Sequence, residues 1–525
     1  MFVDTLLVTA FLLPLFTGIF SFLILKNFSP LLSLRIQFVS TVINSIPLLS
    51  IAYLLYFDFN QTSSAQILGM NNFLMVDHLS VFHILLMVVV FVSSSLYSQV
   101  YFMDEVKSKT HNGKQKEKQN EEKINFARFT GLWNLTMASM SLVLLSNHIM
   151  LIWFALEATT LSTTFLICTN KHKNSVEAMW KYIIICSIGL SIALIGTILF
   201  AYSVVVPSNP VDNMNIWLWT TLKIHSSSLN PLLVKIAFIF VVVGYGTKAG
   251  LAPMHTWLPD AHGEAPAPIS AIFSGFMLNL AVYVILRYIP IASAATSANA
   301  PFVDSVLTIM GIMSLLISTV FIVHQKNLKR LLAYCSVEHI GIISLGLGLG
   351  PAGSFVALLH TLNHSLSKIF AFYASGMIGK IFNTQEISDI KSVMKISPYW
   401  GSALIISLLT LIGVAPFAIF ISEYKLVMIA ITENHWISLF VFAVASIIIF
   451  VAILKHLLSM SYSTYSTTDD STNVGSRDIA NITSIKTSTK EKFLIIILIS
   501  ILLLIGLWMP QPIFNIIQMA SRLIN

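Results

Sequence analysis

Charged residues are scarce in this chain, and their scarcity excludes a soluble protein. Only 10% of the 525 residues are Asp, Glu, Lys or Arg, whereas 56% are hydrophobic. The mean hydropathy is +0.82. Because soluble domains carry roughly 25% charged residues, this chain lacks the polar surface that water requires. The sequence therefore predicts a polytopic membrane protein.

Cysteine and nucleotide-binding motifs are also lacking. The three cysteines, Cys168, Cys186 and Cys335, form no CxxC pair. This argues against an iron–sulfur cluster or a structural zinc ion. Neither a P-loop nor a GxGxxG fingerprint is present, so no nucleotide site is indicated. We expect no cofactor, no metal and no catalytic residues.

Long apolar runs are what the chain has instead. Each bilayer crossing needs about 20 apolar residues, and the runs are continuous rather than alternating, which favours helices over a β-barrel. We expect an all-α polytopic membrane protein with about fourteen transmembrane helices. The predicted spans are 4–26, 31–57, 78–102, 129–146, 149–169, 178–203, 233–253, 266–288, 305–323, 331–349, 354–379, 399–421, 425–454 and 493–509.

The net charge of +7 comes from lysine and arginine residues that lie mainly in particular loops, and it does not indicate binding of nucleic acid. With an outside N-terminus, the inside loops hold Lys26, Arg35, Lys171, Lys173 and the positive charges of 107–128, 326–330, 380–395 and 455–492. The outside loops hold few: Lys223, Arg287, Lys425 and Arg522. The positive-inside rule therefore predicts an outside N-terminus in the inner membrane of a bacterium. The first run reads as a span rather than as a cleaved signal.

Two polar segments divide the chain. Residues 103–128 mix both charge signs and predict a cytoplasmic loop, a flexible insertion being favoured over a docking surface. Residues 456–492 predict a second cytoplasmic loop, and the tail after Pro510 has the pattern of an amphipathic helix at the outer interface. The remaining units are 1–102 with the N-terminal helices, 129–288 as a first repeat, 305–455 as a second repeat, and 493–525 with the last helix and the tail.

The repeats are indicated by two spans that combine a proline with an ionisable residue. These are GTKAGLAPMHTW around Lys248 and LIGVAPFAIFISEYK around Glu423. They are the seventh and the twelfth predicted spans, so equivalent helices run in opposite directions. Inverted repeats with interrupted helices point to a transport site. We therefore expect two inverted five-helix repeats that contain broken helices.

Several ionisable residues lie inside the predicted spans, where an unpaired charge costs several kcal/mol. Glu157 lies in the fifth span and is the natural partner of Lys248, because changing their separation would alter how firmly the lysine holds a proton. The alternatives are a structural ion pair for Glu157 and a lysine that extends to the interface. Glu423 either forms a solvent-exposed pair with Lys425 at the end of a helix or lies at the outer opening of an ion path.

A row of basic groups follows. His360, His364 and Lys368 are spaced four residues apart, so on a helix they share one slowly rotating face. Such a row suits proton hopping through water, and a two-histidine metal site is the weaker alternative. Lys329 fits a positive-inside anchor, whereas Glu338 and His339 within the same helix do not. Asp260, His262 and Glu264 fit a Pro-rich turn with capping roles better than a carboxylate pair.

These motifs resemble the antiporter-like subunits of respiratory complex I, the membrane-bound hydrogenases and the Mrp-type antiporters. The resemblance covers about residues 75–440 and is carried by GYGTKAGLAPMHTWLPDAHGEAPAPISAI, NLKRLLAYCSVEHIGI, the histidine row and GVAPFAIFISEYK. The sequence of the second motif, NLKRLLAYCSVEHIGI, is most similar to that of the F component of hydrogenase-4. The resemblance implies a first half-channel pair, Glu157 and Lys248, and a central row to which Lys329, His360, His364 and Lys368 correspond. We expect His339 to lie on the same proton path. It also implies a terminal carboxylate, Glu423.

Two departures accompany the resemblance. Phe273 and Asn279 stand where other members of the family have a histidine or a lysine, so the relay is expected to be interrupted there or to run through water. The long lateral helix of the family is not expected after the last polar segment.

The resemblance implies a proton-translocating membrane subunit of a multi-subunit redox complex, similar to hydrogenase-4 or to NADH:quinone oxidoreductase. Its partners would be other membrane subunits, protons and the bilayer. An Na⁺/H⁺ antiporter subunit and the proton-coupled membrane subunit of an inorganic-carbon uptake system remain as alternatives. A purely structural scaffold is disfavoured by the intramembrane charges.

Overall fold

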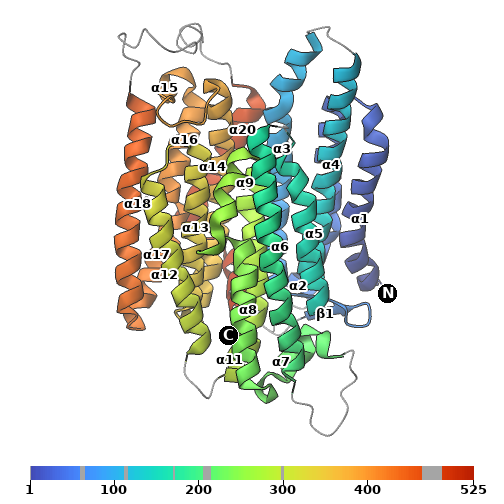
Figure 1. The fold of residues 1–525 in the computed structure, drawn as a ribbon, viewed down its shortest axis with the longest axis vertical. Coiled ribbons are helices and arrows are strands. Elements are labelled where there is room, and N and C mark those ends of the chain that lie inside the picture. Colours follow the sequence, from blue (N-terminus) through green and yellow to red (C-terminus); the bar gives the residue numbers. More distant parts are fainter. Residues whose placement is uncertain are drawn as a thin grey trace.

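The computed structural model describes residues 2–58, 66–111, 116–169, 172–204, 215–296, 301–463 and 487–525, and these form a bundle of long helices (Figure 1). Within these described residues, ten helices or helix combinations are long and apolar enough to cross a membrane. The all-α polytopic fold is thus confirmed.

In the first half of the chain, the described residues form a β-hairpin and eleven α-helices. The hairpin pairs β1 (Gln66–Gly69) with β2 (Leu74–Asp77) in antiparallel register, with Gln66 opposite Asp77. The helices are α1 (Phe2–Ile24), α2 (Pro30–Asp58), α3 (His78–His111), α4 (Lys116–Leu145), α5 (Ile149–Ile167), α6 (Lys173–Tyr202), α7 (Trp219–Ile224), α8 (Pro231–Ala249), α9 (Leu258–Glu264), α10 (Ala267–Ile272) and α11 (Leu278–Thr296).

The second half is helical in all its described elements. They are α12 (Phe302–Val323), α13 (Leu328–Leu347), α14 (Pro351–Phe382), α15 (Val393–Ile396), α16 (Pro398–Leu411), α17 (Ala418–Thr432), α18 (Trp436–Tyr462), α20 (Thr489–Leu507) and α21 (Gln511–Ile524). Among the described residues, the connections within the first half also contain four short 3₁₀ helices, η1 (Leu25–Asn27), η2 (Asn215–Trp217), η3 (Ser226–Ser228) and η4 (Met254–Trp257), and a π-helix, η5 (Phe273–Met277).

Both predicted broken helices are present, and their breaks have the same construction. α8 ends at Gly250 with φ +82°, and α16 is followed by Gly413 with φ +68°; both angles lie in the left-handed region that glycine tolerates. Each glycine begins a Gly-[Leu/Val]-Ala-Pro sequence. After each break the chain is helical again, as α9 and α17. In Figure 1 α9 lies above α8 whereas α17 lies below α16, so the two broken spans run in opposite directions.

Some boundaries differ from the sequence-based prediction. The segment 425–454 is not one helix, because α17 ends at Thr432 and α18 begins at Trp436. The break before α17, residues 412–417, is itself apolar, so hydropathy does not register it. The charged segment 103–128 is largely helical, since α3 continues to His111 and α4 begins at Lys116. Most of the segment 456–492 lies outside the described residues.

The C-terminal tail forms α21, bent by 67° from α20. Its apolar face, which includes Ile516, Ile517 and Ala520, is buried against α3, α11 and α14. The tail is therefore amphipathic, as predicted, but it packs on the bundle and does not offer this face to the membrane surface.

Candidate functional site: a buried row of titratable side chains

Lys248 lies two residues before the first break, on the last turn of α8, and is fully buried. Its Nζ donates to the hydroxyl of Thr160 on α5 at 2.6 Å and to that of Tyr182 on α6 at 2.9 Å. Among the described residues no carboxylate lies within 4.0 Å of this nitrogen. Neutral hydroxyls of two neighbouring helices therefore hold the lysine in place.

Glu157 lies on α5, one turn before Thr160. Its Oε1 accepts a hydrogen bond of 2.8 Å from Ser187 on α6, and its buried Oε2 has no hydrogen-bond partner among the described residues. The structure thus brings Glu157 and Lys248 onto the same group of three helices. It does not join them as a direct ion pair, and Thr160 lies between them on α5.

Phe273 separates this first cluster from the next. The π-helix η5 begins at this residue, and its ring stacks on Tyr182 with centroids 5.8 Å apart. Its other neighbour is His262 of α9, whose ring lies edge-on at 5.7 Å. His262 is fully buried; its Nδ1 bonds the Leu258 carbonyl, and its Nε2 has no partner in the described structure. The turn-and-capping interpretation of His262 was therefore wrong.

Lys329 and Lys368 are held by backbone carbonyls. Lys329, near the start of α13, donates to the carbonyl oxygens of Ala265 at 2.8 Å and Gly263 at 3.3 Å. Lys368 of α14 is fully buried and donates to the carbonyl oxygen of Leu332 at 2.7 Å. Leu332 lies one turn after Lys329 on α13, so both ammonium groups lie beside the first turns of this helix. Lys329 is only 6% exposed, which disfavours the alternative of a solvated anchor.

Three histidines form a cluster between α13 and α14. His339 Nδ1 and His360 Nε2 are 3.0 Å apart, and His360 Nδ1 lies 2.9 Å from the Ser422 hydroxyl of α17. The ring of His364 is 5.3 Å from that of His339, and neither of its nitrogens has a hydrogen-bond partner within the described ranges. The predicted row on α14 is thus extended by His339 from α13 and continues to α17.

Two carboxylates accompany this cluster. Glu338 on α13 is 4% exposed, and its Oε2 is buried without a partner in the part of the chain that the structure describes. It lies in the tenth predicted span, five spans after Glu157. Glu423 lies on α17 against the second break, because a Cβ at position 413 would collide with its Oε2. Counted from the glycines of the breaks, Glu423 corresponds to Asp260, which pairs with Lys181 and Arg330 at 2.9 Å each.

Asn279 follows the π-helix and is fully buried. Its Nδ2 donates to the Gly275 carbonyl and to the Ser365 hydroxyl of α14, at 3.1 and 2.7 Å, whereas its Oδ1 has no partner among the described residues. π-Helices are rare and are found frequently at functional sites. The two positions that depart from the family pattern, Phe273 and Asn279, thus lie at or just after the one local distortion of this span.

A buried ion pair lies midway along α11, and sequence reasoning missed it. Arg287 donates to both carboxylate oxygens of Asp77, at the end of β2, and also to the Ser80 and Tyr283 hydroxyls. Burial alone would raise the pKa of Asp77, but the adjacent Arg287 guanidinium outweighs this and lowers that pKa below its usual value. The assignment of Arg287 to an outside loop was therefore wrong. The two residues are 210 positions apart, so no local pattern relates them.

Other contributors to the site gave no signal in the sequence. Thr160, Tyr182 and Ser187 are neutral hydroxyl residues, which are common in membrane helices. Glu338 carried a signal, an acid inside an apolar helix, but it was not included among the predicted path residues. Among the described residues no three His, Cys, Asp or Glu side chains are grouped so as to hold a metal ion.

The comparisons with known proteins identify the family of the chain. The family model described as NADH:quinone oxidoreductase/Mrp antiporter, transmembrane region, matches residues 146–449. The chain belongs to this family. The matched residues contain all eight of the side chains predicted to line the path, namely Glu157, Lys248, Lys329, His339, His360, His364, Lys368 and Glu423.

The relatives of this antiporter family that the chain resembles include a hydrogenase-4 component F homolog of Methylacidiphilum infernorum. It is 37% identical over 356 residues, which are 67% of this chain and 71% of the relative. Hydrogenase-4 component B of Escherichia coli is 29% identical over 67% of this chain and half of its own length. A chain of the membrane-bound sulfane sulfur reductase, an archaeal respiratory membrane complex, has the same fold, with a TM-score of 0.80 at 22% identity over 99% of this chain and 97% of that one.

Proposed function

We propose that this chain is the proton-translocating membrane subunit of a multi-subunit redox complex, similar to hydrogenase-4 or to NADH:quinone oxidoreductase. The observation that carries the proposal is that three lysines are buried without a paired carboxylate among the described residues. Lys248, Lys329 and Lys368 are at most 6% exposed, and none has a carboxylate within ion-pair distance among the described residues. A buried ammonium without a counter-charge is costly, and in membranes such groups mark ion paths.

Lys248 has surroundings that suit a group that gains and loses a proton. The hydroxyls of Thr160 and Tyr182 accept hydrogen bonds from an ammonium, and each can instead donate to the lone pair of a neutral amine. Both the charged and the neutral form of the Lys248 side chain can therefore be hydrogen-bonded at the same position. In this proposal a change in the distance between Glu157 and Lys248 changes the electrostatic support for the charged form and releases or takes up the proton.

The histidine cluster suits transfer by hopping. A neutral imidazole donates through one nitrogen and accepts through the other, so His339, His360 and the Ser422 hydroxyl form a chain that can pass a proton by successive transfers. His364 is available to a water molecule because its nitrogens are unoccupied by described groups. We propose that protons move through Lys329, Lys368 and this cluster to Glu423.

A cation/proton antiporter subunit is the second candidate, and the family description, which includes the Mrp antiporters, supports it. The two functions differ in their dependence on Na⁺. Proton movement that requires a redox substrate and is unaffected by Na⁺ supports the first, whereas Na⁺-driven proton exchange without a redox substrate supports the second.

The chain is a multi-pass membrane protein, and we propose that its N-terminus lies outside. Figure 1 supports the orientation: the N-terminus lies at the lower end of the bundle, whereas the upper end carries the ends of α3 and α4, which contain most of the charged segment 103–128. Subunits that co-purify with the tagged chain would identify the complex.

The experiment that tests the proposal replaces Lys248 by Met in the assembled complex, reconstituted in vesicles. We expect redox turnover and assembly to persist while proton uptake into the vesicles is lost. The matched control is Lys235→Met near the start of the same helix, where the lysine is partly exposed and lies over the Phe302 ring. Undiminished proton uptake by the Lys248→Met complex would contradict the proposal.

A further inference from the structure

A long crevice lies on the outside of the bundle, between α1, α4 and α5, away from the buried row. It consists of two cavities of about 430 and 440 Å³, and Leu132 and Phe165 line both of them. Each volume lies within the range of small-molecule sites, about 300–1,000 Å³. Because the two cavities share these two side chains, they are adjacent, and together they are called the trough.

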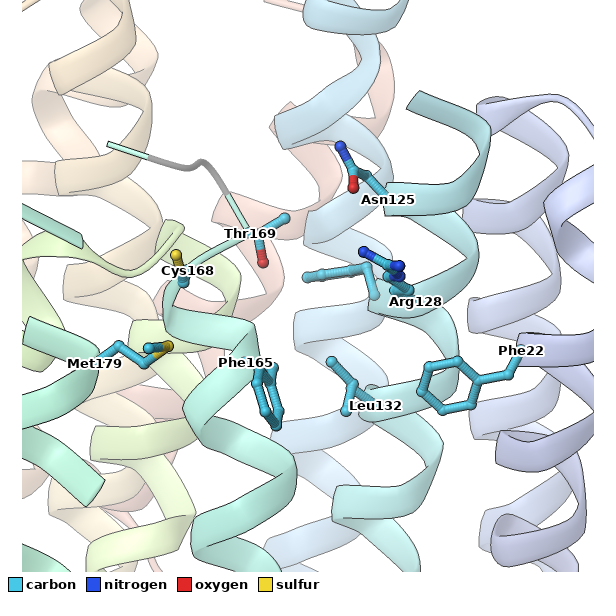
Figure 2. A pocket seen from close by; sticks show the side chains of 9 residues that line it. Phe22, Asn125, Arg128, Leu132, Phe165, Cys168, Thr169 and Met179 are labelled. Carbon is cyan, nitrogen blue, oxygen red and sulfur yellow. The ribbon is translucent and has the colours of Figure 1, made fainter. Parts of the chain in front are cut away.

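The two ends of the trough differ in polarity. Figure 2 shows Asn125 and Arg128 on α4 at its upper end, opposite Cys168 and Thr169, with Leu132 and Phe165 below them. Farther along, the trough is lined by apolar side chains of α1, α4 and α5, with the hydroxyls of Ser139 and Ser162 as the exceptions. One end therefore suits a polar group and the rest suits a hydrocarbon chain.

The length of the trough fits one leaflet of a bilayer. Along α4 it extends from Arg128 to Leu142, which at 1.5 Å per residue is about 21 Å. Half of a hydrocarbon core of about 30 Å is about 15 Å, to which the headgroup region adds several ångströms. Arg128 therefore lies at headgroup depth when the apolar end reaches the middle of the membrane.

The charge at the polar end is positive and has no partner in the described structure. Arg128 is exposed and forms no ion pair there, and no acidic side chain lines either cavity. The amide of Asn125, one turn earlier, adds a hydrogen-bond donor. Basic pockets between transmembrane helices at this depth recognise anionic headgroups.

We propose that this trough is a binding site for one anionic phospholipid. Its phosphate lies against the Arg128 guanidinium and the Asn125 amide, and one acyl chain follows Leu132 and Phe165 towards the middle of the bilayer. The trough opens towards the lipid-facing surface, where Phe154 and Phe165 are 61% and 59% exposed. The lipid would join α1 to the first repeat across a gap that protein side chains leave open.

The test measures lipid retained by the complex purified through a tag on this chain. The complex is incubated in mixed micelles of phosphatidylglycerol and phosphatidylcholine, and lipid bound to the released subunit is counted by native mass spectrometry. We expect selective retention of phosphatidylglycerol, and we expect Arg128→Gln to lower that retention about fivefold, the effect of one arginine near an anionic surface. Arg35→Gln on α2, also an exposed arginine but outside the trough, is the matched control and should retain the lipid.

A second pair of variants tests the apolar part. Ala158→Phe places a ring in the trough and should lower retention of both lipids, whereas Ile188→Phe on the exposed face of α6 should not. Equal retention of the two lipids by the unaltered chain, or unchanged retention by Arg128→Gln, would overturn the proposal. It would also be overturned if a neighbouring subunit of the complex were found cross-linked to a cysteine placed at Phe165.

Discussion

The Asp77–Arg287 pair provides a quantitative test of how this bundle is held together. Arg287 is 1% exposed and Asp77 is 3% exposed at their side chains, and the pair ties the hairpin strand β2 to α11. Replacing Asp77 by Asn keeps the shape of the side chain but leaves a buried guanidinium without its counter-charge.

The expected loss in the free energy of unfolding is about 3–5 kcal/mol, the usual result of removing one partner of a buried pair. The structure favours the lower part of this range. Arg287 would keep its hydrogen bonds to the Ser80 and Tyr283 hydroxyls, and the rings of Trp219 and Tyr283 lie 4.9 and 4.8 Å from its guanidinium carbon. These contacts compensate part of the lost charge.

The assay is equilibrium unfolding in mixed micelles with increasing dodecyl sulfate. Asp260→Asn is the matched control, because Asp260 is an aspartate paired with Lys181 and Arg330 whose side chains are 46% and 44% exposed. Such pairs contribute about 0–1 kcal/mol. If Asp77→Asn destabilises the chain no more than Asp260→Asn does, the assignment of Asp77–Arg287 as a stabilising buried pair is refuted.

The pH dependence of this difference follows from the lowered pKa of Asp77. A carboxyl whose pKa is lower in the folded than in the unfolded protein stabilises the fold fully above the unfolded value, about 3.9, and loses this effect as the pH falls through the folded value. The difference between the unaltered chain and Asp77→Asn should therefore stay constant from about pH 8 to 5 and shrink below about pH 4. A difference that already declines between pH 7 and 5 would point to another titrating group.

Three further predictions concern the path. Gly413→Ala should lower the free energy of unfolding by about 1–2 kcal/mol in the same assay, because the φ of residue 413 is positive and a Cβ there would meet the Glu423 carboxylate of α17. Gly246→Ala, within α8, is the control. His360→Gln should slow proton uptake in vesicles while the complex still assembles, because an amide donates and accepts but does not take up a proton; His324→Gln, on the exposed end of α12, should have no effect. Phe273→Leu should leave proton uptake coupled to the redox reaction, and uncoupled turnover would show that the ring itself is required.

The sequence predicted those parts of the site that depend on charged residues, which are costly to bury in a membrane, or on residues that interrupt helices. A lysine such as Lys248 is conspicuous in an apolar run, and a glycine followed three residues later by a proline favours a break in a helix. The fold class and both broken helices follow from these local signals. The break before α17 was visible through Gly413 and Pro416 even though hydropathy treated the segment as continuous.

What the sequence did not reveal depends on contacts between distant segments. Asp77 and Arg287 lie on different elements, and only the packing of β2 against α11 makes them a pair. His262 was interpreted as part of a turn because three prolines surround it, whereas it lies in α9 and tertiary packing buries its ring against Phe273 and Phe372. The immediate partners of Lys248 are hydroxyls from two other helices, and nothing local to Lys248 selects them.

The position of Phe273 shows how the two halves can be coupled without a continuous chain of hydrogen bonds. The Lys248 nitrogen lies 5.2 Å from the centre of the Tyr182 ring. The ring centres of Tyr182, Phe273 and His262 follow at distances of 5.8 and 5.7 Å, the first contact stacked and the second edge-on. Lys248 and His262 are therefore no more than about 17 Å apart. At an effective dielectric constant of about 20, a unit charge at that distance changes the free energy of placing a second charge by roughly 1 kcal/mol, or about fivefold in a protonation equilibrium. Because leucine at position 273 would leave this field in place, protonation of Lys248 would still influence the second half, although no proton crosses the ring.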